Sequence, residues 1–256
     1  MIDLHSHVLP GLDDGPPDMA GSLALAHAAA RAGTRVMAAT PHVGHRYPVV
    51  PGELAERVAV LNEALAAARI PLDVVVGGEL AASRAADLAI PDLEAIALGG
   101  SSCLLVECPF VASGGVLPAL ATHFRDLGFR VLLAHPERSP ECHQDPELLP
   151  ELVEDGCFVQ LTASSFAGDF GRTVRRYAHA LLAAGLVHVV ASDAHDAADR
   201  GPEMLDTVAR AVRRAGLPPE ATEFLTEDAP RALLEDTALP RFPVRGRARR
   251  VWARRR

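Results

Sequence analysis

The sequence predicts an α/β barrel built from seven parallel strands. Short runs rich in Val, Leu and Ala alternate with amphipathic helical patterns along most of the 256 residues, which is typical of parallel strands that are buried on both faces. Polar residues follow almost every run, and barrel enzymes build their sites at the C-terminal ends of the strands. A doubly wound open sheet is the alternative, and this placement of the polar residues favours the barrel.

The strands and helices are predicted from the period of the apolar residues. Strands are expected at residues 2–4, 36–40, 72–76, 103–106, 130–134, 157–161 and 187–191. Helices are expected at residues 52–69, 116–124, 146–155, 172–184, 203–215 and 228–235. No linker, repeat or change of composition occurs before residue 240, so we expect a single domain over residues 1–240.

The distribution of charge excludes several classes of protein. All 25 basic residues are Arg, so a Schiff-base lysine and a Walker A lysine are both excluded. Residues 1–240 carry 17 arginines against 33 acidic residues, a formal charge of −16, which argues against a nucleic-acid groove. Residues 241–256 hold eight Arg and no acidic residue. We expect a disordered tail there, with peripheral contact to an anionic membrane surface or to an acidic partner as the alternative.

The cysteines and the start of the chain indicate a cytoplasmic protein. Cys103, Cys108, Cys142 and Cys157 form no C-x-x-C motif, and the first residues do not resemble a secretory signal, so reduced thiols are expected. No apolar run approaches the roughly 20 residues of a membrane span.

Potential metal ligands follow six of the seven predicted strands. They are His5, His7, Asp14, His42, Glu79, Glu107, His135, Asp193 and His195. A single His or Glu at a strand end is usually a cap or a surface contact, but six such ends would be an odd coincidence. So many charges in one barrel mouth would also repel each other unless cations lay between them. The sequence therefore predicts a multinuclear metal site.

Phosphate-ester hydrolysis is the reaction that this site favours, with amide hydrolysis second. Metal ions lower the pKa of bound water and align it for attack on phosphorus or a carbonyl carbon. Arg138 lies three residues after His135, and its planar guanidinium suits phosphate oxygens; the alternative for Arg138 is a salt bridge to Glu137 or Glu141. Cysteine and serine nucleophiles are poorly supported, because no cysteine is followed by Arg six positions later and no G-x-S-x-G motif occurs.

The motifs around these residues resemble those of the polymerase and histidinol phosphatase (PHP) superfamily. They are the Asp-Leu-His-Ser-His opening with Leu-Asp-Asp-Gly, then Ala-Thr-Pro-His, Gly-Gly-Glu, Val-Glu, Ala-His-Pro-Glu-Arg and Ala-Ser-Asp-Ala-His. Within it, the chain from residue 1 to about residue 235 resembles the bacterial protein-tyrosine phosphatases of capsule and exopolysaccharide loci, the CpsB/YwqE type. The resemblance implies a distorted TIM-like (β/α)7 barrel, the PHP fold, that holds three divalent metal ions. Manganese is expected, and iron or zinc would also suit such ligands.

The resemblance also implies a role for each candidate residue. It implies that His5, His7, Glu79 and Asp193 hold the first metal, that Glu79, Glu107 and His135 hold the second, and that Asp14, His42 and His195 hold the third. Arg138 would bind the phosphate and act with Asp193 and His195 in catalysis. His45 and Arg46, in a loop over the barrel mouth, are candidate substrate contacts, although an ordinary polar loop is an equal alternative.

The function implied is that of a metal-dependent protein-tyrosine phosphatase. Its expected substrate is the C-terminal tyrosine cluster of a bacterial tyrosine kinase that regulates capsular or exopolysaccharide synthesis. One alternative is a small-molecule phosphoesterase on the same scaffold, such as a histidinol-phosphate or nucleotide phosphatase. A second alternative, from another class, is a non-catalytic regulatory subunit, which the full set of ligands argues against. The sequence does not determine the oligomeric state.

Overall fold

The computed structural model describes residues 1–111 and 114–243, so the tail predicted at residues 241–256 lies almost entirely outside the described residues. Over the described ranges the strands are β1 (Ile2–Ser6), β2 (Val36–Ala39), β3 (His42–Val43), β4 (Asp73–Val76), β5 (Glu79–Ala81), β6 (Cys103–Glu107), β7 (Arg130–Ala134), β8 (Phe158–Thr162) and β9 (Val189–Ala191). All seven predicted strands are present.

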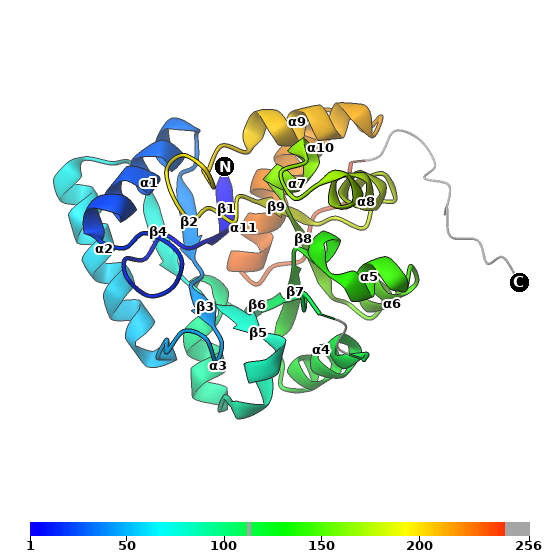
Figure 1. The fold of residues 1–256 in the computed structure, drawn as a ribbon, viewed down its shortest axis with the longest axis horizontal. Coiled ribbons are helices and arrows are strands. Elements are labelled where there is room, and N and C mark those ends of the chain that lie inside the picture. The colour runs from blue at the N-terminus through cyan, green and yellow to red at the C-terminus, as the bar shows by residue number, and fades with distance from the viewer. Residues whose placement is uncertain (112–113, 244–256) are drawn as a thin grey trace, which may run out of the picture.

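The helices surround the strands, as Figure 1 shows. The α-helices are α1 (Met19–Arg31), α2 (Leu54–Ala68), α3 (Ile90–Ile96), α4 (Val116–Asp126), α5 (Pro140–Gln144), α6 (Leu148–Glu154), α7 (Ala163–Ala167), α8 (Arg172–Ala183), α9 (Leu205–Arg214), α10 (Glu220–Glu223) and α11 (Ala229–Leu234). The tighter turns η1 (Pro51–Glu53), η2 (Ala82–Asp87), η3 (Leu98–Gly100) and η4 (Pro136–Arg138) are 3₁₀ helices, and η5 (Phe224–Asp228) is a π-helix. Each predicted helix is found within a few residues of its expected bounds.

The strands are parallel and form two sheets that continue into one another. One sheet has the order β1-β2-β4 and the other has the order β3-β5-β6-β7-β8-β9. The sheets meet where β1 and β9 lie side by side, because Ser6 and Ala194 form a bridge, His7 N donates to Ala194 O at 2.8 Å and Asp193 N donates to His5 O at 2.9 Å. On the other side, the chain continues from β2 into β3 and from β4 into β5. Strand β2 pairs with β4 in one sheet, and β3 pairs with β5 in the other.

The barrel is distorted because two strands are interrupted. Pro41 has no N–H to donate between β2 and β3, and Gly77 and Gly78 separate β4 from β5. A Cβ at Gly78 would lie 2.9 Å from side-chain atoms of both Ile96 and Val43, so only glycine fits this close approach. The short strands β3 and β5, which the sequence analysis did not separate from their predecessors, place His42 and Glu79 side by side in register.

Apolar side chains fill both faces of the strands. In β6, Leu104 and Val106 pack into the large core between strands and helices, whereas Cys103 and Leu105 face the second core inside the barrel. Leu233 of α11 belongs to this inner core. Glu107 shares the strand face of Leu105, because side chains alternate along a strand. The inner face of the barrel is therefore apolar along the strands and carries the predicted metal ligands at their ends.

Five α-helices of the described ranges were not predicted: α1, α3, α5, α7 and α10. Helices α3 and α5 have seven and five residues, and each has a proline in its first turn. Such segments are too short to show a repeat of the 3.6-residue period, although proline suits the first turn of a helix.

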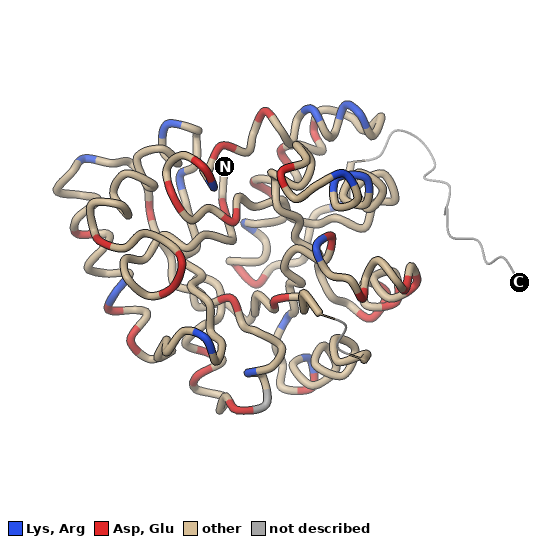
Figure 2. The backbone as a smooth tube through the Cα atoms, in the orientation of Figure 1, with Lys and Arg blue, Asp and Glu red and all other residues tan. Residues whose placement is uncertain are grey.

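Figure 2 shows basic residues grouped on α8 and α9 at the outside of the barrel. Within the described ranges, no helix is long and apolar enough to cross a membrane.

Candidate active site

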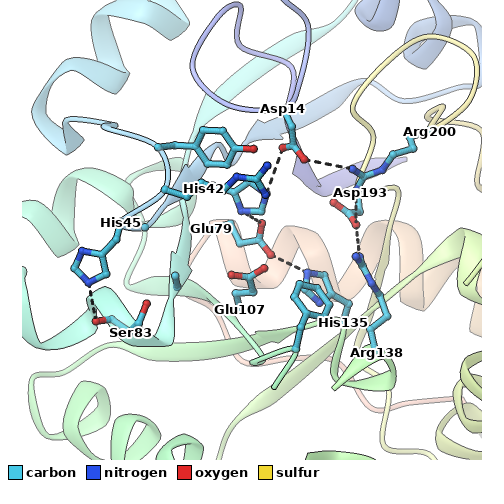
Figure 3. A pocket seen from close by; sticks show the side chains of 15 residues that line it. Asp14, His42, His45, Glu79, Ser83, Glu107, His135, Arg138, Asp193 and Arg200 are labelled. Atoms are coloured by element: carbon cyan, nitrogen blue, oxygen red, sulfur yellow. Dashed lines mark hydrogen bonds and ion pairs between the residues drawn. The ribbon is translucent and has the colours of Figure 1, made fainter. Parts of the chain in front are cut away.

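Nine side chains predicted as metal ligands converge at the C-terminal end of the strands, as Figure 3 shows for six of them. His5 lies in β1 and His7 directly follows it; Asp14 lies in the loop before α1. His42 and Glu79 begin β3 and β5, Glu107 ends β6, and His135, Asp193 and His195 follow β7 and β9. Most of these side chains are buried, and Asp14, His42 and Glu107 are more accessible.

Glu79 is at the centre of the group. Its Oε1 lies 2.7 Å from Nε2 of His135, and its Oε2 lies 3.0 Å from Nδ1 of His42. The same Oε2 is 3.3 Å from Nε2 of His5 and 3.5 Å from Nε2 of His7. One fully buried carboxylate therefore contacts four imidazoles, each from a different strand end or loop position.

Asp193 is a second point of convergence beside Glu79. Its Oδ1 lies 3.4 Å from Nε2 of His5 and 3.4 Å from Nε2 of His7. The two histidines thus place their Nε2 atoms between the carboxylates of Glu79 and Asp193. This arrangement follows from the His-x-His spacing in β1, which turns both side chains to the same face.

Asp14 lies between two further histidines at the open side of the site. Its Oδ1 is 3.4 Å from Nε2 of His42 and 3.3 Å from Nε2 of His195. His195 is oriented from behind, because its Nδ1 lies 2.9 Å from the carbonyl oxygen of Asp193.

The backbone turns sharply at two of these positions. His135 has φ = 36° and Asp193 has φ = 55°, which is the left-handed region that residues other than glycine seldom occupy. Such a conformation costs about 1–3 kcal/mol and persists only where the surrounding structure enforces it. Here it redirects the chain just after β7 and β9, so that both side chains point into the site.

The charges of the site are strongly coupled. Burial opposes ionisation of Glu79, but contacts with His5, His135 and His42 hold its pKa well below its usual value. Burial raises the pKa of Glu107 to about 7, and the nearby charge of Glu79 adds to this effect.

The pKa values of two histidines of the site are shifted in opposite directions. Burial lowers the pKa of His7, but hydrogen bonds to Asp13 and Asp193 outweigh it and bring the value to about 10. Burial and the charge of His7 lower the pKa of His195 to about 4. Because metal ligands must be deprotonated, metal binding to these groups would be linked to the release of protons.

Several buried polar atoms at the centre form no well-aligned hydrogen bond among the described residues, although side-chain atoms of opposite charge lie 3.0–3.5 Å away. They include Nε2 of His5, His7 and His195 and Oε2 of Glu79. A buried polar atom without a partner costs about 1–3 kcal/mol, so native structures rarely leave several together. Nitrogen and carboxylate oxygen are the donors that manganese, iron and zinc accept, and the residues present therefore fit metal ions.

The candidate ligand atoms form four groups, and within each group all atoms lie within 4.8 Å of one another. These are His7, Asp14, His42 and His195; His5, His7 and Asp193; His5, Glu79 and His135; and His42, Glu79 and Glu107. The set implied for the third metal falls within the first group. The set implied for the second metal is divided, because His135 and Glu107 each group with Glu79 but not with each other.

Arg138 contacts Asp193 rather than a neighbouring glutamate. Its Nη1 donates to Asp193 Oδ2 at 2.7 Å, whereas Glu137 is buried and accepts from Thr162 N and Ser165 Oγ. The ion pair of Arg138 in this structure is therefore with Asp193, and Glu137 faces Thr162 and Ser165 instead.

Arg200, which the sequence analysis did not select, also lies in the site. Its Nη2 is 3.3 Å from Asp193 Oδ2, and its Nη1 is 3.8 Å from Asp14 Oδ2. It follows His195 by five residues in a loop with no periodic pattern, so only the spacing to the final Asp-x-His motif could have suggested it.

Asp13 and Gln160 orient the histidines from outside the site. Asp13 Oδ2 lies 2.7 Å from Nδ1 of His7 and also accepts the backbone N–H of His42 at 2.9 Å. Gln160 Oε1 lies 3.0 Å from Nδ1 of His5. Partners of this kind fix the ring orientation of ligating histidines. Gly15 allows the loop to close over His7, since a Cβ there would lie 2.1 Å from the His7 carbonyl oxygen.

The loop after β3 forms one side of a pocket of about 380 Å3 over the ligands. His45 is 60% exposed, and its Nε2 lies 3.3 Å from Ser83 O, so the ring points away from Glu79, as Figure 3 shows. Arg46 packs its guanidinium over the ring of Tyr47, 5.1 Å from the centroid. Both predicted substrate contacts line the pocket, and their contacts among the described residues are with Ser83, Asp87 and Tyr47 rather than with the predicted metal ligands.

Comparison with known proteins identifies relatives over nearly the whole chain. The sequence profile of the family described as capsular polysaccharide synthesis, CpsB/CapC, matches residues 1–235. The tyrosine-protein phosphatase YwqE of Bacillus subtilis is 34% identical over 250 residues, covering 96% of this chain and 98% of that protein. The tyrosine-protein phosphatase CpsB of Streptococcus pneumoniae is 27% identical over 242 residues, covering 92% and 99%.

A solved structure agrees with the fold. It belongs to a study of YwqE from Bacillus subtilis and CpsB from Streptococcus pneumoniae, described as unique metal-dependent tyrosine phosphatases. Its TM-score to this chain is 0.82 at 33% sequence identity, and the match covers 97% of this chain and 100% of the other. The predicted fold class is confirmed by this agreement.

Proposed function

Because the chain belongs to the CpsB/CapC family of capsular polysaccharide synthesis, we propose that it is a metal-dependent phosphatase that hydrolyses phosphotyrosine in proteins. The observation that carries this proposal is the meeting of the buried carboxylates of Glu79 and Asp193 with four imidazoles, beside the guanidinium of Arg138. Relatives at 34% and 27% identity are named tyrosine-protein phosphatases.

Three divalent ions would be held by the ligands that converge here. We assign His5, His7, Glu79 and Asp193 to the first, Glu79, Glu107 and His135 to the second, and Asp14, His42 and His195 to the third, with manganese as the expected metal and iron or zinc as alternatives. Bound metal ions of this type supply an activated water and stabilise the charge that develops on a phosphoryl group. The unsatisfied Nε2 atoms of His5, His7 and His195 support the assignment.

Arg138 would bind two oxygens of the phosphate. A guanidinium offers five N–H donors in a planar fork, and the recorded bond to Asp193 uses one of them. The remaining donors can hold phosphate oxygens and follow their charge into the transition state. Phenol has a pKa of about 10, so the tyrosine side chain leaves without a strong general acid.

The substrate that we propose is the C-terminal tyrosine cluster of a bacterial tyrosine kinase that regulates capsular or exopolysaccharide synthesis, with both proteins in the cytoplasm. His45 and Arg46 line the pocket entrance, where they would meet residues that flank the phosphotyrosine. The Arg-rich residues beyond 243 would extend such contacts to an acidic partner or to the membrane surface.

Turnover with three substrates tests the proposal. A phosphotyrosine peptide, a phosphoserine peptide of the same sequence and histidinol phosphate are compared with manganese added, and a chelator-treated sample is the control. Preference for the phosphotyrosine peptide, lost in chelator, is expected. Preference for histidinol phosphate would indicate a small-molecule phosphoesterase instead, and no turnover of any substrate would favour a regulatory subunit.

A further inference from the structure

Two aromatic side chains stack on two histidines of the site. The ring of Tyr47 lies parallel to that of His42, with centroids 5.5 Å apart and an interplanar angle of 9°. The ring of Phe110 lies parallel to that of His135, with centroids 5.4 Å apart and an interplanar angle of 12°. These aromatic residues have no part in the ligand assignment.

The two stacked pairs lie on different sides of Glu79. His42 contacts Oε2 of this carboxylate and His135 contacts Oε1, and Figure 3 shows the two imidazoles on opposite sides of Glu79. Tyr47 and Phe110 both line the pocket above the carboxylate. The pocket therefore has an aromatic ring on each of two sides, with the ligand side chains at its floor.

Phe110 is 45% exposed and lines the pocket, so its ring is accessible to a bound molecule. It also lies next to the group that would bind phosphate, since the guanidinium carbon of Arg138 is 4.8 Å from the Phe110 centroid. An organic group attached to a phosphate at Arg138 would therefore emerge beside this ring.

We propose that Tyr47 and Phe110 are the specificity-determining residues of the site and that they select phosphate esters with a flat aromatic leaving group over alkyl esters. This inference rests on the proposed phosphatase function. The phenyl ring of phosphotyrosine would pack against the two aromatic sides, in the offset or edge-to-face geometries that aromatic pairs prefer. The single methylene of phosphoserine is too short to reach such contacts and offers no ring.

Phe110 has a second contact that any test must separate from this role. Arg138 lies between Phe110 and Phe170, with its guanidinium carbon 4.3 Å from the Phe170 centroid. Replacement of Phe110 therefore also removes a contact that holds Arg138, and this loss alone would weaken phosphate binding. Phe170 does not line the pocket over the ligands, so Phe170→Leu removes an aromatic contact of Arg138 without removing an aromatic side of this pocket. It is the matched control.

The experiment measures the preference for an aryl group in binding and in turnover. Phenylphosphonate and methylphosphonate are compared as competitive inhibitors, and a phosphotyrosine and a phosphoserine peptide of one sequence are compared as substrates, all with manganese. The variants are Phe110→Leu, Tyr47→Leu and Tyr47→Phe, with Phe170→Leu as the control. Each lost ring should reduce the aryl preference by about threefold to tenfold, the usual worth of an aromatic pair.

The expected pattern is specific to the proposed role. The aryl preference is the inhibition constant of methylphosphonate divided by that of phenylphosphonate. Phe110→Leu and Tyr47→Leu lower this ratio, and Tyr47→Phe keeps it. Phe170→Leu weakens both inhibitors equally and leaves the ratio unchanged. Unchanged ratios in both leucine variants, or an equal loss of preference in Phe170→Leu, would overturn the inference. A wild-type protein that hydrolyses no phosphate ester would instead refute the proposed function, and this result is distinct from either outcome.

Discussion

Replacement of Arg138 separates phosphate binding from metal binding more cleanly than any other change in the site. Its guanidinium is held by Asp193 at 2.7 Å and by the rings of Phe110 and Phe170 at 4.8 and 4.3 Å. Because three contacts fix its position, the fork is preorganised for an anion, and little reorganisation is needed when charge develops on the phosphate.

The magnitude follows from this preorganisation. Loss of one donor of this kind lowers kcat by about 100-fold or more, equal to about 2.7 kcal/mol or more, so Arg138→Ala should turn over a phosphotyrosine peptide at about one hundredth of the wild-type rate. Arg138→Lys should recover only part of the loss, since an ammonium group cannot bind two oxygens in a planar fork.

The assay combines steady-state kinetics with elemental analysis and thermal unfolding. In the Arg138→Ala protein, Asp193 keeps Arg200 at 3.3 Å, so metal content and melting temperature should stay close to the wild type. Arg57→Ala is the matched control, because the exposed Arg57 of α2 forms its ion pair with Glu53 of η1 among the described residues, away from the site. Wild-type kinetics in Arg138→Ala, or a loss of metal equal to its loss of activity, would refute the role in phosphate binding.

Three further predictions concern the metals. Chelation should abolish turnover and lower the melting temperature, because ligand binding to the folded state stabilises it by about 2.7 kcal/mol at 100 times the dissociation constant; full activity in metal-free protein would contradict the proposal. Glu79→Gln should lose metal and activity together, since this carboxylate contacts four imidazoles, and an unchanged metal content by elemental analysis would show the assignment to be wrong. Asp13→Asn should weaken metal binding by about 10- to 100-fold in a metal titration, whereas the exposed Asp73→Asn on β4 should not.

The convergence of the candidate ligands at one end of the barrel could be predicted because the strands are parallel. All strands of such a barrel end on the same side, so His42, Glu79, Glu107 and His135 had to meet once the strands were identified. The spacing of His5 and His7 settled their common direction in the same way. The sequence therefore determined the fold class, the end of the barrel that carries the site and the residue types available there.

Details that depend on loops could not be obtained in this way. Asp13 and Asp14 are adjacent and chemically equal, yet Asp13 orients His7 from behind while Asp14 faces His42 and His195. Only the course of the loop, closed over His7 by Gly15, distinguishes them.

The same limit applies to the residues that surround Arg138. Phe110 and Phe170 are 60 positions apart and belong to loops without periodicity, so no local pattern connects them to Arg138 or to each other. Both rings reach Arg138 because of the strand order β6-β7-β8 and the directions in which the following loops leave the strands. The sequence by itself determined which ligands are present and at which end of the barrel; the tertiary structure alone decided which groups surround them, because contacts between distant loops are set by packing rather than by local preference.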